Sequence, residues 1–168
     1  MKQVANVAKN IAEKIAANGH LVDGEFTQQL ALLHDLMKEV SYTPKLQKKY
    51  GTEHDAEISS DILKKLGELD LAKSLKTQQF DAVISKSHPL EFLEEKIAYY
   101  ADKRVAHDKI VTLKFRLEEG YARFNNGKPL KAKSKKLLSI ESGIKKLETE
   151  LSKLAGEKLS VCFSEGKK

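Results

Sequence analysis

The sequence has few of the cysteines and long apolar runs that are typical of secreted and membrane proteins. Its single cysteine, Cys162, excludes an intramolecular disulfide and lacks the CxxC context of a zinc or redox site. No apolar run approaches the ~20 residues that a membrane-spanning helix needs. The N-terminal stretch MKQVANVAKNIAEK carries charge where a signal peptide has its apolar region. We therefore expect a cytoplasmic protein that does not contact a membrane.

Helix breakers are also scarce, with three prolines and nine glycines in 168 residues. No stretch alternates apolar and polar residues for more than a few positions, so strands are not expected. The length suffices for one compact core, and we predict an all-α bundle. Helical spacing and stop signals place the helices at about 4–17, 24–38, 52–66, 78–85, 90–106 and 108–124, with a loop over 41–51.

The net charge of +6 is concentrated in the lysine-rich C-terminal segment. We therefore divide the chain into a helical domain, 1–127, and a basic tail, 128–168. Apolar residues recur in the tail at steps of three and four, as in a helix with one buried face: Leu137, Ile140, Ile144, Leu147, Leu151 and Leu154. That face packs on the body of the chain or on a second copy, which leaves monomer and homodimer open. The lysines form a solvated face or bind an anionic partner such as nucleic acid.

The stretch LALLHDLMK places a histidine and a carboxylate side by side in an apolar helical segment. His34 follows Leu30 by four residues and precedes Met37 by three, so it lies on the buried stripe. A buried imidazole needs partners for both nitrogens, and a buried carboxylate needs a cation. Either a metal ion satisfies both His34 and Asp35, or His34 bonds a backbone carbonyl while Asp35 lies at the surface.

Three further residues suit the same chemistry. His54 is expected in the first turn of a helix, where the helix dipole favours the neutral, metal-binding imidazole. His88 precedes Pro89 at another helix start, and Asp102 lies near the buried face of its helix. Helical bundles hold metal ions through side chains that point inward from several helices. The pair His107-Asp108 is expected to cap a helix.

Four stretches, in this order, resemble motifs of one known family. LALLHDLMK is similar to an ALLHDIGK motif, EHDAEISSDILKKLG to a second histidine segment, ISKSH to a helix-closing histidine, and EEKIAYYADKRVAHDKIVTLKFRLEEG to a closing segment with an "ADK" aspartate. Together they resemble the HD-domain metal-dependent phosphohydrolases over about residues 1–125. The resemblance implies that His34, Asp35 and Asp102 bind a metal ion, and that His54 and His88 serve a second ion or the substrate phosphate.

One feature of that family is not matched. Its first-helix histidine ligand precedes a VAxxAxxIA pattern that begins here at Val4, and would lie just before Met1. We expect either that the sequence begins one residue late or that this ligand is lacking.

The resemblance also implies a reaction and a cofactor. The reaction is hydrolysis of a phosphomonoester or phosphodiester of a nucleotide or related small metabolite. The cofactor is one or two divalent ions among Mn, Fe, Mg, Co, Ni and Zn, which nitrogen and oxygen ligands do not distinguish. Asp35 would orient or deprotonate a water molecule, and Lys38 and Arg104 would contact the phosphate. Arg116, Tyr121 and Arg123 border a nucleotide pocket or belong to an ordinary amphipathic helix.

Two alternatives remain open. A degenerate HD domain would bind a nucleotide or RNA without turnover, which the missing histidine and the basic tail favour. An HD-type di-iron oxygenase would need the full histidine set. The sequence contains no P-loop or dinucleotide fingerprint, so neither an ATP-driven activity nor a dehydrogenase is indicated.

Overall fold

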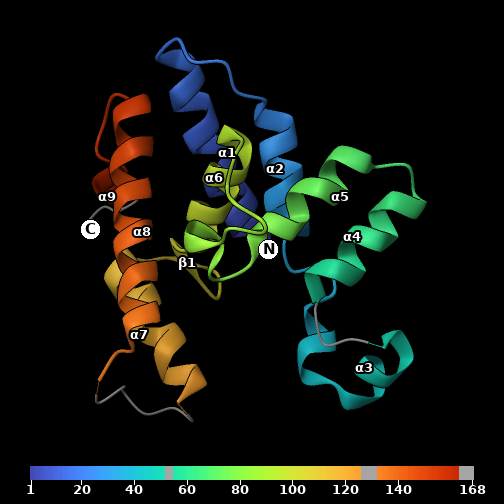
Figure 1. The fold of residues 1–168 in the computed structure, drawn as a ribbon. Helices are drawn as coiled ribbons and strands as arrows, with labels where there is room; N and C mark the ends of the chain where they lie inside the picture. The colour runs from blue at the N-terminus through green and yellow to red at the C-terminus, as the bar shows by residue number, and fades with distance from the viewer. Residues whose placement is uncertain (52–54, 126–131, 163–168) are drawn as a thin grey trace.

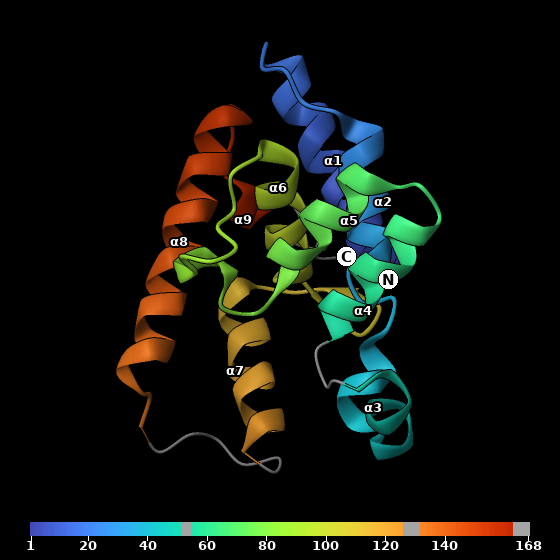
Figure 2. The ribbon, with the colours of Figure 1, turned by 45° about the vertical axis from the view of Figure 1, so that its right-hand side comes forward.

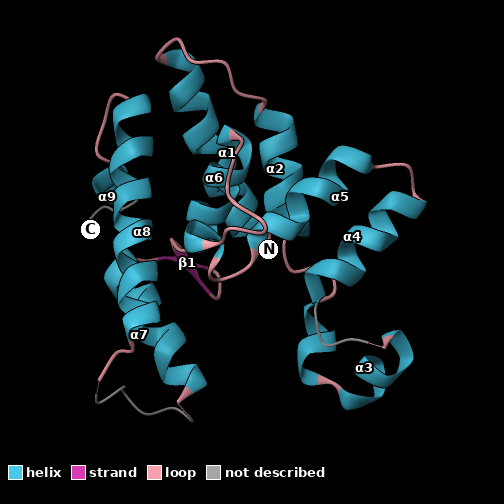
Figure 3. Cartoon of the chain, in the orientation of Figure 1, coloured by secondary structure: helices cyan, strands magenta, loops and turns pink. Residues whose placement is uncertain are grey.

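The fold is a helical bundle whose centre is formed by three helices. The structure, a computed structural model, describes residues 1–51, 55–125 and 132–162. Helices α1 (Lys2–Ala17), α2 (Gly24–Leu33) and α6 (Leu93–Asp102) pack against one another, as Figure 1 shows. The predicted all-α class is confirmed: among the described residues the regular elements are helices apart from one short strand pair, as Figure 3 shows.

Helix α1 follows the predicted apolar stripe. Its valine, alanine and isoleucine side chains at helical spacing are all at most 5% exposed: Val4, Ala5, Val7, Ala8, Ile11, Ala12 and Ile15. The helix ends at Ala17 because Gly19 adopts φ of +88°, a left-handed conformation that glycine tolerates without strain. This helix forms the wall of the core that α2 and α6 share.

The predicted loop over 41–51 is wrong. Residues Lys38–Tyr42 form a 3-10 helix, η1, and Pro44–Tyr50 form helix α3. Pro44 occupies the first position of α3, where its missing N–H would have no helical partner in any case. Helix α3 buries no residue, and Figures 1 and 2 both show it at the periphery of the molecule. The proline therefore starts a helix here instead of marking a loop.

The middle of the chain has more and shorter elements than predicted. Helix α4 (Asp55–Lys65) is followed by α5 (Leu69–Leu75), which was not predicted. The predicted helix over 78–85 is instead two 3-10 turns, η2 (Lys76–Gln78) and η3 (Ala82–Ile84).

Helix α6 begins later than predicted because of one buried carboxylate. The side chain of Glu95 accepts hydrogen bonds from the backbone N–H groups of Glu91 and Phe92 and so closes the N-terminus. The helix ends at Asp102, four residues before the predicted end at 106. The chain then enters a hairpin instead of continuing as helix.

That hairpin is a departure from the expected absence of strands. Strand β1 (Val105–Ala106) pairs antiparallel with β2 (Lys109–Ile110), and His107 at the turn has φ of +56°. His107-Asp108 is therefore a hairpin turn and not a helix cap. Helix α7 (Leu113–Phe124) starts five residues later than predicted. Its N-cap is Thr112, whose hydroxyl accepts the N–H of Phe115.

The C-terminal elements cover one side of the central helices. Helix α8 (Lys135–Leu154) buries Ile140, Ile144, Leu147 and Leu151 in the same core as α6, and the short α9 (Leu159–Cys162) follows. The predicted domain boundary at 127 lies outside the described residues. Among the helices of the described ranges, none is long and apolar enough to cross a membrane.

Candidate functional site

The site centres on His34, which caps the C-terminal end of α2. Its Nδ1 lies 2.7 Å from the carbonyl oxygen of Ala31, and because a carbonyl only accepts, Nδ1 carries the proton. Its Nε2 lies 3.2 Å from Oδ2 of Asp35 and 3.5 Å from Oδ1 of Asp102. Burial alone would lower the pKa of His34, but hydrogen bonds and charge interactions with Asp102 and Asp35 raise it to about 9.

Asp102, the last residue of α6, is surrounded by positive charge. Its Oδ2 lies 2.6 Å from Nζ of Lys103, and its Oδ1 lies 3.5 Å from a guanidinium nitrogen of Arg116. Burial alone would raise the pKa of Asp102, but Lys103, His34 and Arg116 hold it well below its usual value. This carboxylate therefore stays ionised at any physiological pH.

Asp35 and Lys38 form the more exposed side of the site. Nζ of Lys38 lies 3.6 Å from Asp35 and 3.2 Å from Asp55 at the start of α4. Burial opposes the charge on both groups. The pKa of Asp35 is nevertheless lowered by His34 and Lys38, and the pKa of Lys38 is raised by Asp55 and Asp35. Lys38 thus links the end of α2 to α4 as a cation.

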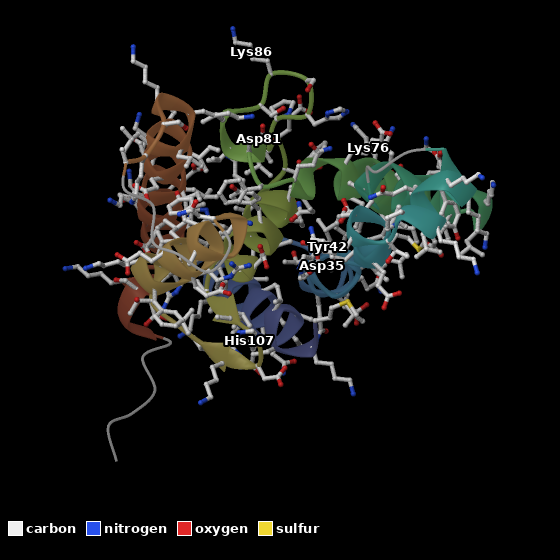
Figure 4. All side chains as sticks on the ribbon, turned by 90° about the horizontal axis from the view of Figure 1, so that it is seen from below. Asp35, Tyr42, Lys76, Asp81, Lys86 and His107 are labelled. Carbon is white, nitrogen blue, oxygen red and sulfur yellow. The ribbon has the colours of Figure 1, made fainter. Side chains whose placement is uncertain are left out.

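These side chains line a pocket of about 420 Å³. Its walls come from four parts of the chain: His34, Asp35, Lys38 and Tyr42; Gln78 and Phe80; Asp102 and Lys103; and Arg116, Leu117 and Gly120. Figure 4 shows Asp35 and Tyr42 together near the middle of the molecule. A smaller pocket, of about 210 Å³, shares His34, Asp35, Asp102 and Arg116 and is also lined by Met1 and His107. The imidazole and both carboxylates are therefore accessible.

The structure brings together some predicted site residues and not others. His34, Asp35, Lys38 and Asp102 line one pocket. His54 lies outside the described residues. His88 is exposed and absent from this pocket, and Figure 4 shows Lys86, two residues earlier, at the far edge from Asp35. Metal binding by His54 and His88 stays a prediction.

The expected role of Arg104 in substrate binding needs correction. Arg104 is 1% exposed and does not line the pocket. Its guanidinium donates to the carbonyl oxygens of Val111 and Leu159 and to the hydroxyl of Tyr100. The physical reason is that the chain leaves α6 after Asp102, so that Lys103 lies beside the pocket and Arg104 points into the core toward α9.

Several pocket residues escaped the sequence reasoning. Tyr42, Gln78 and Phe80 lie in segments predicted as a loop and a short helix, and the fold brings them to one pocket although 36 positions separate Tyr42 from Gln78. No local pattern marks them. Arg116 was predicted as one of two alternatives, a pocket residue or part of an ordinary amphipathic helix, and it lines the pocket. The feature of the sequence that marks it is a charged residue on the buried side of helix α7.

The residues present suit a divalent ion in donor type. Two ligand atoms about 2.1 Å from one ion, at right angles to each other, are about 3 Å apart. The separations of Nε2 from the two carboxylates, 3.2 and 3.5 Å, are close to that value. The Nδ1–H bond to Ala31 is the kind of contact that orients a metal-binding imidazole. Within the described ranges, however, no group of three or more His, Cys, Asp or Glu side chains has the arrangement of a formed metal site.

Comparison with known proteins identifies the family. Searches of curated proteins and of solved structures gave no significant match. The HD domain family matches residues 1–107, which include α1, His34, Asp35 and Asp102. Because this match covers well over half of the 168 residues, the chain belongs to the HD domain family.

Proposed function

We propose that this protein is a metal-dependent phosphohydrolase that acts on a nucleotide or a related small phosphate ester. The supporting observation is the position of His34 Nε2 between the carboxylates of Asp35 and Asp102, inside a pocket that also holds Lys38, Lys103 and Arg116. Membership of the HD domain family, many of whose members are metal-dependent hydrolases, supports the same reading.

In this proposal His34, Asp35 and Asp102 hold a divalent ion. When bound, such an ion would polarise a phosphate oxygen and lower the pKa of a bound water. The bond from Nδ1 of His34 to Ala31 fixes the ring so that Nε2 faces the carboxylates of Asp35 and Asp102, where it would give up its proton to bind the ion. The lowered pKa values of Asp35 and Asp102 keep both carboxylates ionised and ready to bind a cation.

The remaining pocket residues act on substrate and water. Asp35, with 37% of its side chain exposed, is the carboxylate best placed to orient a water molecule and accept its proton. Lys38 remains a cation because Asp55 and Asp35 raise its pKa, and its ammonium group contacts a phosphate oxygen. Tyr42 and Phe80 give the pocket an aromatic wall that suits a nucleobase or another flat group.

The proposal is tested by metal content and phosphate release together. We expect the purified chain, reconstituted with Mn²⁺ and dialysed, to retain metal and to release phosphate from at least one member of a nucleotide panel. Asp102→Asn should lose both properties. Asp61→Asn, which changes an exposed carboxylate of α4, is the matched control and should lose neither. Retained metal with no hydrolysis of any phosphate ester would contradict the catalytic proposal.

A second function, nucleotide or RNA binding without turnover, is favoured by one observation. Asp102 already has the cations of Lys103 and Arg116 beside it, so its charge is balanced without a metal ion. Under this alternative the pocket binds nucleotide with chelator present and releases no phosphate. Titration of the chain with AMP in EDTA, followed by a phosphate assay in Mn²⁺, separates the two functions.

A further inference from the structure

Arg116, on α7, has a guanidinium group that is fixed at two of its three nitrogens. Its Nε donates a 2.7 Å hydrogen bond to the carbonyl oxygen of Val105, and its Nη1 lies 3.3 Å from the carboxylate of Glu119. The side chain is 17% exposed and lines the pocket. The plane of the guanidinium is therefore set by the hairpin and by its own helix.

The third nitrogen, Nη2, is differently placed. Its nearest ionic partner is Oδ1 of Asp102, at 3.5 Å, which is beyond the 2.7–3.2 Å typical of N–H···O hydrogen bonds. No hydrogen bond from Nη2 occurs within the part of the chain that the structure describes. An arginine that is held at Nε and Nη1, and whose Nη2 makes only the long ion pair with Asp102, can donate from Nη2 to an anionic oxygen in the pocket.

Gly120 lies beside this guanidinium. It lies one turn after Arg116 in the interior of α7 and also lines the pocket. A Cβ atom at this position would lie 3.4 Å from Nη1 of Arg116. A side chain at this position would therefore contact the guanidinium, and glycine leaves that side of Arg116 uncovered.

The charges of the pocket point to an anionic ligand. Lys38, Lys103 and Arg116 face only two carboxylates within the lining, Asp35 and Asp102. Outside the lining, Lys38 is balanced in part by Asp55, and Arg116 by Glu119. A divalent ion on Asp35 and Asp102 would neutralise those two carboxylates and leave three cations against Asp55 and Glu119, an excess of one positive charge. A phosphate group supplies the negative charge that such a site lacks.

Lys103 is less suited than Arg116 to bind that phosphate. It is 5% exposed, and its Nζ lies 2.6 Å from Asp102 and 4.4 Å from the centre of the Tyr99 ring. The carboxylate and the ring therefore enclose its charge. Arg116 instead has one nitrogen, Nη2, whose only partner among the described residues is Asp102 at 3.5 Å.

We propose that Arg116 binds the phosphate group of the substrate through Nη2, as a substrate-binding residue that α7 contributes from outside the matched residues 1–107. This inference rests on the proposed function, because it assumes a phosphorylated ligand in this pocket. It adds α7 and the Val105 hairpin, which holds Nε, to the machinery of the site.

The test uses inorganic phosphate as the probe and isothermal titration of the full chain in Mn²⁺. We expect Arg116→Gln to weaken phosphate binding at least tenfold and Arg116→Lys to give an intermediate loss, because lysine keeps the charge without the planar fork. Lys114→Gln removes the same charge from an exposed position of the same helix and should bind phosphate as the wild type does. Metal content, measured by elemental analysis, should be unchanged in all three.

The possible outcomes separate this inference from the proposed function. Phosphate binding that depends on Arg116 in a chain that hydrolyses no ester supports the inference and contradicts the proposed hydrolysis. Equal phosphate affinity of the wild type and Arg116→Gln overturns the inference, as does a wild type that binds no phosphate at millimolar concentration. If circular dichroism shows that Arg116→Gln does not fold, the test uses Arg116→Lys instead. An affinity of Arg116→Lys for phosphate equal to that of the wild type would then overturn the proposed role of the guanidinium.

Discussion

Nε2 of His34 lies 3.5 Å from Oδ1 of Asp102, although 68 positions separate the two residues in the sequence. The histidine caps α2 and the aspartate ends α6, so the contact joins the C-terminal ends of two central helices. Negative charge is favourable at neither helix end. The site therefore places acidic side chains at helix ends whose partial negative charge repels them. Nearby cations must offset this repulsion.

Replacing Asp102 by asparagine should lower the free energy of unfolding of the metal-free chain. Lys103 is nearly buried and would lose its carboxylate partner, so we expect a loss of about 3 kcal/mol in the free energy of unfolding. Urea denaturation in EDTA measures it. Asp61→Asn, at an exposed ion pair of α4, should change the stability by under about 0.5 kcal/mol. Equal stabilities of the two variants would contradict this account.

The metal-free chain should lose stability as the pH rises from about 6.5 to 9. The folded pKa of His34, about 9, is above the ordinary value of 6.5, so folding favours the protonated ring. Its contribution, at most about 3 kcal/mol, is complete below pH 6.5 and disappears as the pH passes 9. The measurement is urea unfolding of the wild type and His34→Gln in EDTA at several pH values. The difference between them should shrink with rising pH, and a constant difference would refute the prediction.

Arg104→Ala should affect stability far more than substrate binding. The substitution removes a buried guanidinium that contacts Val111, Tyr100 and Leu159 and lies 3.8 Å from Glu148. Loss of one partner from such a buried network costs about 3–5 kcal/mol. Thermal unfolding measures the loss, and the KM of any substrate found should change little. A raised KM with unchanged stability would restore Arg104 as a substrate contact.

Gly143→Ala should destabilise the contact between α8 and η3. A Cβ at residue 143 would lie 2.8 Å from a methyl group of Val83, too close for packed atoms. We expect overpacking to cost about 1–3 kcal/mol, more than the ~1 kcal/mol that alanine gains over glycine in a helix. Ser142→Ala, next to it on the exposed side, is the control. Addition of Val83→Ala should restore part of the loss, and a stabilised single variant would contradict the close packing.

The sequence predicted which four side chains line the main pocket better than it predicted the segments around them. His34, Asp35, Lys38 and Asp102 could be placed because a short motif and helical spacing both mark them. The expected substrate contact of Arg104 is wrong because α6 ends at Asp102, and helical spacing does not extend past a helix end. Tyr42, Gln78 and Phe80 could not be found, since each reaches the pocket through a 3-10 turn or bend whose direction depends on tertiary packing. The loop over 41–51 was predicted wrongly because proline is common both in loops and at the first position of a helix, and Pro44 occupies the latter.

The bonds of Arg104 also bear on how much of the chain is needed for independent folding. Two of its acceptors, the carbonyl oxygens of Val111 and Leu159, and its ionic neighbour Glu148 all lie beyond residue 107, where the family match ends. A fragment truncated at that point would retain a buried cation without these partners, two positions from Asp102. The smallest autonomous folding unit should therefore extend at least to Leu159, about 50 residues past the segment that identifies the family.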